Sequence, residues 1–113
     1  MDELTNDAKY FLTVGYKCYL DKIANGASKK NARLLGDIPD IQESLFPEWK
    51  NQDIADLSDE LKDQGYVSSE QYWGPFPSEI RLTTKSIAYN EQKFKRDAHA
   101  VVDGIIKLKQ LIF

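Results

Sequence analysis

One segment, residues 53–91, constrains the fold of this chain more than any other, because it carries helix, strand and turn signals in a fixed order. Its first part has apolar residues at the spacing of one helix face, namely Ile54, Leu57 and Leu61. Gly65 then offers a left-handed position at low cost, so a helix is expected to end there. Strand-like runs over 66–72 and 78–82 flank a turn rich in glycine and proline. The segment therefore predicts a helix, a β-hairpin and the start of another helix.

The rest of the chain is expected to be mainly helical. Residues 4–24 have an amphipathic pattern, and residues 37–46 and 51–64 predict two shorter helices. The pattern of residues 28–35 is ambiguous: it is compatible with a turn of helix in its basic half (Lys29, Lys30, Arg33) and with a short strand over residues 33–35. The last element is predicted to be one long C-terminal helix over residues 84–112. The fold class is thus mostly α with a small β-hairpin.

Length and composition fit a single domain over residues 1–113. Apolar residues make up 42% of the chain and charged residues 29%, which is ordinary for a globular protein with a core. The residues of the helix–hairpin–helix segment that are expected to be buried together are Leu57, Leu61, Tyr66, Ile80, Leu82 and Ile87.

Several features favour a cytoplasmic protein without cofactor or metal. No apolar run is long enough to cross a membrane, and the first residues do not have the pattern of an export signal. Cys18 is the single cysteine, so no disulfide can form within the chain. His99 is the single histidine, and neither a second histidine nor a cysteine accompanies it as a metal ligand. No phosphate loop, nucleophile elbow or dinucleotide motif is present, so an enzyme is not expected.

The order of helix, short helix, turn, helix and hairpin is that of a winged helix-turn-helix. Residues 82–91 (LTTKSIAYNE), following residues 65–67 (GYV), resemble the hairpin-to-helix segment of YjcQ-type winged-helix proteins. The first two-thirds of the chain is similar to small uncharacterised proteins of Firmicutes and their prophages. That similarity rests on Tyr19-Leu20, residues 26–29 (GASK), residues 35–37 (LGD) and residues 47–49 (PEW). The resemblance implies a prophage-associated winged helix with no catalytic residue, although Ser86 stands where the family has glycine.

Charge is unevenly distributed along the chain. Residues 1–36 carry +2, residues 37–63 carry −7 and residues 64–113 carry +2, which gives the net charge of −3. The expected outward positions of the third helix include five acidic residues, namely Asp53, Asp56, Asp59, Glu60 and Asp63. A helix that enters the major groove needs basic or amide side chains there, because DNA repels carboxylates. The usual DNA-reading geometry is therefore not expected.

Two functions follow as alternatives. The first is a non-catalytic protein-interaction or regulatory module, in which the acidic third helix meets a basic partner. The second is a DNA-binding transcriptional regulator with weak affinity, which uses the wing and basic residues near the N-terminus. Its candidate nucleic-acid-binding residues are Arg81, Lys85, Lys29, Lys30, Arg33 and Trp73.

The C-terminal helix also predicts a homodimer. Its apolar residues follow an approximate heptad spacing, which is typical of a helix–helix seam. The expected interface consists of Phe94, Ala98, Val101, Ile105, Leu108 and Ile112. The alternative is that this helix folds back onto the first helix of the same chain, for which Gly104 leaves room.

Overall fold

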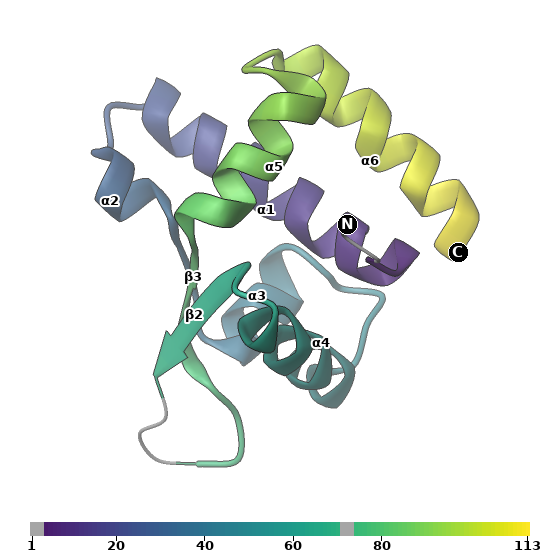
Figure 1. Cartoon of the computed structure of the whole chain (residues 1–113). Helices are drawn as coiled ribbons and strands as arrows, with labels where there is room; N and C mark the ends of the chain where they lie inside the picture. The colour runs from purple at the N-terminus through teal and green to yellow at the C-terminus, as the bar shows by residue number, and fades with distance from the viewer. Residues whose placement is uncertain (1–3, 71–73) are drawn as a thin grey trace.

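The computed structural model describes residues 4–70 and 74–113, and in these residues helices surround a small sheet (Figure 1). The elements follow in the order α1 (Asn6–Ala24), α2 (Lys29–Ala32), β1 (Leu34–Gly36), α3 (Ile38–Ser44), α4 (Asn51–Asp63), β2 (Val67–Glu70), β3 (Ser78–Leu82), α5 (Thr84–Phe94) and α6 (Ala98–Ile112). The prediction of a mostly α fold with a small hairpin is confirmed.

The three strands form one antiparallel sheet in the order β1-β3-β2. The hairpin of β2 and β3 pairs Val67 with Leu82, and β1 pairs with the other edge of β3, where Leu34 lies opposite Arg81. This pairing brings the chain just after α2 next to the second strand of the hairpin. The short strand with which the pattern of residues 33–35 is compatible is therefore present, and it completes the sheet.

The helix boundaries have the local causes that the sequence indicates. The Thr5 side chain accepts a hydrogen bond from the Ala8 amide at 3.1 Å and caps α1. Thr83 caps α5 in the same way through the Ser86 amide. Gly65, at φ +85°, follows α4 and turns the chain into β2.

α1 is the central helix of the core, and it contacts α2, α4, α5 and α6. In Figure 1 it runs through the middle of the molecule, with α5 and α6 above it and α3 and α4 below. The residues that the sequence predicts to be buried together are at most 8% exposed, and they belong to one connected core: Leu57, Leu61, Tyr66, Ile80, Leu82 and Ile87.

The prediction of one continuous helix over residues 84–112 is wrong. α5 ends at Phe94, and Lys95 adopts φ +55° and ψ −135°, which no helix allows. Asp97 then caps α6 by accepting hydrogen bonds from the amides of His99 and Ala100. The Tyr16 hydroxyl of α1 donates to the Lys95 carbonyl and holds the turn against the core. The chain therefore reverses here, and α6 packs along α1.

This reversal also changes the predicted dimer seam. Phe94, Val101 and Leu108 are 8%, 0% and 7% exposed, so they lie inside this chain's own core and cannot form the centre of a contact with a second copy. Ile105 and Ile112 pack partly against the same core, and Ala98 is exposed at the start of α6. Of the two arrangements considered, the one in which the C-terminal helix folds back onto the first helix is observed.

Gly104 makes the close packing of α5 and α6 sterically feasible. A Cβ atom at this position would lie 2.7 Å and 2.8 Å from the Cε1 and Cζ atoms of Phe94, which is closer than real Cβ contacts come. The absence of a side chain therefore lets the Phe94 ring lie directly on the backbone of α6.

Candidate functional site

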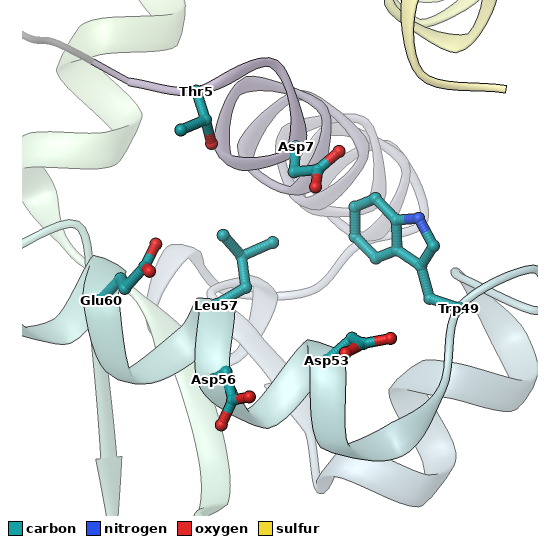
Figure 2. A pocket seen from close by; sticks show the side chains of 7 residues that line it. All are labelled: Thr5, Asp7, Trp49, Asp53, Asp56, Leu57 and Glu60. Carbon is teal, nitrogen blue, oxygen red and sulfur yellow. The ribbon is translucent and has the colours of Figure 1, made fainter.

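A groove lies between the start of α1 and one face of α4, and we call it the acidic groove (Figure 2). Its volume is about 330 Å³. The side chains that line it are Thr5, Asp7, Trp49, Asp53, Asp56, Leu57 and Glu60.

The helical period of α4 determines which side chains reach the groove. Ile54 and Leu61 are fully buried beneath the helix, so the acidic residues between them occupy its outer side. Leu57 lies at the boundary and is 8% exposed. In Figure 2, Leu57 and Glu60 point from α4 toward the start of α1, whereas Asp56 points away from it. The groove thus has an apolar floor and a charged rim.

Trp49 forms one wall of the groove and is held by neighbouring aromatic rings. Its ring stacks on Phe46 with centroids 5.0 Å apart, and Tyr10 of α1 meets it edge-on at 5.4 Å. Phe113, just after α6, lies 6.2 Å away. Aromatic packing of this kind restricts the rotation of the indole, so the wall is a preformed flat surface.

The carboxylates at the rim are largely without partners. In the part of the chain that the structure describes, the carboxylates of Asp7, Asp53 and Glu60 make no hydrogen bond or ion pair. Asp56 accepts one hydrogen bond from the Gln52 amide at 2.9 Å. Among the described residues, no basic side chain lines the groove. The arrangement favours a cationic ligand that also has an apolar portion.

A metal ion is a poorer fit than an organic cation. Among residues 4–70 and 74–113, no three histidine, cysteine or acidic side chains come together as a metal site requires. The rim carboxylates are spread over two helices, on either side of the apolar floor (Figure 2).

A second hollow, of about 450 Å³, brings together three of the predicted nucleic-acid-binding residues, and we call it the basic hollow. Lys30, Arg33 and Arg81 line it, along with Ser68, Leu82, Thr83 and Thr84. Figure 1 shows α2, which carries Lys30, and α4 on opposite sides of the strands.

Two of the other predicted nucleic-acid-binding residues, Lys29 and Lys85, do not line the basic hollow. Lys29 is exposed at the start of α2. Lys85 donates a hydrogen bond to the Gln64 carbonyl at 2.7 Å, and its Nζ lies 4.4 Å from the Tyr66 ring centroid. Trp73 lies outside the residues that the structure describes.

The sequence indicated only part of the acidic groove. The acidic face of α4 was predicted, but the contributions of Thr5, Asp7 and Trp49 were not. Asp7 has a local role in the first turn of α1, where it favours the positive end of the helix dipole. Its proximity to α4 comes from tertiary packing, for which the sequence carries no local signal.

Comparison with protein-family models, curated proteins and solved structures finds no match to this chain. Within the described residues, no helix is both long and apolar enough to span a bilayer.

Proposed function

We propose that this chain is a single winged-helix domain that acts as a non-catalytic protein-interaction or regulatory module. Its acidic groove binds a basic, partly apolar segment of a protein partner. The order of helices and strands and the β1-β3-β2 sheet support the winged-helix part of the proposal. The resemblance to prophage proteins supports a regulatory setting by analogy.

The helix in the place of a recognition helix, α4, supports a protein ligand over a DNA groove. Most of its exposed residues are carboxylates, which a polyanion would repel. The same charges attract Lys and Arg side chains and increase the rate of encounter with a basic partner.

The observation that carries the proposal is the set of unpartnered carboxylates around an apolar floor. A bound Lys or Arg can lay its methylene groups on Leu57 while its charged end meets Glu60 or Asp53. The face of Trp49 offers a further cation–π contact. Each interaction is modest, but together they select basic side chains with long apolar stems.

The test uses a labelled peptide with lysines and arginines around one leucine, and a matched peptide with glutamate at the basic positions. The groove variant combines Asp53→Asn and Glu60→Gln. The control combines Asp59→Asn and Asp63→Asn, which remove the same charge from the same helix outside the groove.

Fluorescence anisotropy at physiological salt should show binding of the basic peptide only. The substitutions of the groove variant should lower the affinity for the basic peptide roughly fivefold, since two exposed ion pairs contribute about 0.5 kcal/mol each. The control should bind as the parent protein does. Equal weakening by both variants would show diffuse charge attraction and refute a groove-specific site, and so would binding of the glutamate peptide.

A homodimer belongs to the same proposal, on residues other than those first expected. Val102 and Ile106 are 39% and 50% exposed and lie four residues apart, so they share the outward side of α6. Asp103 and Lys107 flank this side one turn apart. Antiparallel pairing of two α6 helices would place Asp103 beside Lys107 of the partner subunit, so opposite charges would border the apolar contact.

A further inference from the structure

The basic hollow gathers cations from segments that are far apart in the sequence. Lys30 lies on α2, Arg33 is the residue after it, and Arg81 lies on β3. The antiparallel pairing of β1 with β3 is the cause, because it places the end of α2 beside Arg81. Within residues 4–70 and 74–113, no acidic side chain lines the hollow.

Arg33 is held in place through both its backbone and its side chain. Its carbonyl accepts a hydrogen bond from the Leu82 amide at 2.9 Å. Its Nη1 donates to the Thr84 hydroxyl at 3.1 Å. The guanidinium is therefore oriented before any ligand arrives, which lowers the entropy that binding must overcome.

The cations of the hollow retain unused hydrogen-bonding capacity. Arg33 Nε is shielded from solvent and has no partner within the described residues. In the same residues Lys30 makes no side-chain hydrogen bond or ion pair. Arg81 and Glu79 are 4.0 Å apart and both are more than a third exposed, so this ion pair is weak and can exchange for a stronger ligand.

The start of α5 adds hydrogen-bond donors to the same place. Thr83 and Thr84, the cap and first residue of this 11-residue helix, line the hollow. The Thr83 hydroxyl is already engaged, because it accepts a hydrogen bond from the Ser86 amide and donates one to the Gly65 carbonyl. The first amides of a helix, by contrast, have no partner within the helix itself and can act as donors. The positive end of the helix dipole thus reinforces the three side-chain charges.

We infer that the basic hollow binds the phosphate backbone of double-stranded DNA without reading its bases. Guanidinium groups and hydroxyls are the groups that proteins use for phosphate oxygens. Lys29, exposed beside Lys30, extends the positive surface beyond one phosphate. The inference goes beyond the proposed protein interaction, because it concerns another surface and another class of ligand.

The experiment measures anisotropy of a labelled duplex of mixed sequence between about 50 and 200 mM salt. Three phosphate contacts predict a slope near −2.7 for log affinity against log salt, or roughly a 40-fold loss over this range. Dissociation constants should lie in the non-specific range of about 10⁻⁶–10⁻⁴ M.

Two variants remove one exposed cation each, Arg81→Gln and Lys30→Gln, and a third is Arg33→Gln. Each variant should make the salt dependence less steep, with a slope of about −1.8, so that affinity falls only roughly 12-fold over the same range. Lys50→Gln, at an exposed position just before α4, removes the same charge outside the hollow and should leave the slope unchanged. Circular dichroism checks folding, and the two exposed positions keep the test valid should Arg33→Gln unfold.

Three outcomes would overturn the inference. The first is an unchanged slope in Arg81→Gln and Lys30→Gln. The second is a clear preference for one duplex over a scrambled duplex of the same composition, since base reading would then contribute. The third is displacement of the duplex by inorganic phosphate at an equal concentration of phosphate groups, which would identify a free-phosphate site. None of these outcomes affects the peptide test of the acidic groove, so the two proposals can fail independently.

Discussion

The reversal of the chain at Lys95 predicts that a glycine there will stabilise the protein. Lys95 has φ +55° and ψ −135°, a backbone conformation that glycine adopts freely and residues with a Cβ atom do not. Such a conformation costs about 1–3 kcal/mol in a residue other than glycine. Glycine adds a conformational-entropy cost of about 0.5–1 kcal/mol through the unfolded chain. Lys95→Gly should therefore raise the free energy of unfolding by about 0.5–2 kcal/mol.

The same substitution would have the opposite sign if α5 and α6 were one helix. A glycine inside an exposed helix costs close to 1 kcal/mol. Gln92→Gly provides this control, because Gln92 is exposed and lies within α5, one turn before the reversal. The hydrogen bond from Tyr16 to the Lys95 carbonyl is preserved in Lys95→Gly, since its acceptor is a backbone atom.

Urea unfolding followed by circular dichroism measures both variants. With a slope of about 1.5 kcal/mol per molar urea, Lys95→Gly should move the midpoint upward by roughly 0.3–1.3 M. Gln92→Gly should move the midpoint downward by roughly 0.7 M. The reasoning is refuted if Lys95→Gly lowers the midpoint as Gln92→Gly does, because Lys95 would then be an ordinary helical residue.

Three further predictions concern packing, pH and association. Gly104→Ala should lower the free energy of unfolding by about 1 kcal/mol, because overpacking against Phe94 exceeds the gain in helix propensity. In a protein that already carries Phe94→Leu, the same change should raise the free energy of unfolding by about 1 kcal/mol, as measured by urea unfolding. Burial raises the pKa of the Tyr10 and Tyr16 phenols above 10.0, so the unfolded chain loses these protons first. The contribution of the two phenols to stability is complete below pH 10 and should decline as pH rises through the folded pKa. Tyr16→Phe should make this decline less steep, as measured by urea titrations at several alkaline pH values. Light scattering at tens of micromolar protein should give a mass of about 26 kDa, twice the chain mass of 13.0 kDa. Ile106→Asp should restore the monomer mass, because a buried charge in the contact would have no partner. A parent protein that stays at 13.0 kDa would exclude the dimer.

Local signals explain why most helices and strands could be predicted from the sequence. Gly65 acts within a few residues of its own position and has the predicted effect, and the caps at Thr5 and Thr83 are equally local. The apolar spacing of α4 likewise identified its buried side, because the helical repeat determines which residues of a helix face the core.

The break between α5 and α6 was missed because the approximate heptad spacing of apolar residues continues across it, from Phe94 to Ala98 and Val101. Lys95 and Arg96 are compatible with a helix, and Asp97 was not recognised as a cap. The forces that favour the break are tertiary, namely the Tyr16 hydrogen bond and the burial of Val101 against α1. A heptad-like spacing cannot distinguish a helix that pairs with a second copy from one that folds back, since both bury the same stripe.

The two candidate sites differed in predictability for the same reason. The carboxylates of α4 follow one another along one helix, so the acidic face could be anticipated from spacing. Asp7 and Trp49 reach the groove only because α1 packs beside α4 and the aromatic rings meet. The basic hollow depends on the β1–β3 pairing, which joins Arg33 to a strand nearly fifty residues later.

Separation of the opposite charges leads to a final prediction. α2 and α4 lie on opposite sides of the strands, in a molecule at least 29 Å across along each principal axis (Figure 1). Salt screens exposed charges beyond about 8 Å at physiological ionic strength and beyond about 30 Å at 0.01 M. Neutralising the groove with Asp53→Asn and Glu60→Gln should therefore change duplex affinity by less than about twofold at physiological salt, yet raise it severalfold at 0.01 M. A severalfold rise at physiological salt would show that the acidic residues act directly on bound DNA, and the assignment of the two ligands to separate surfaces would then be wrong.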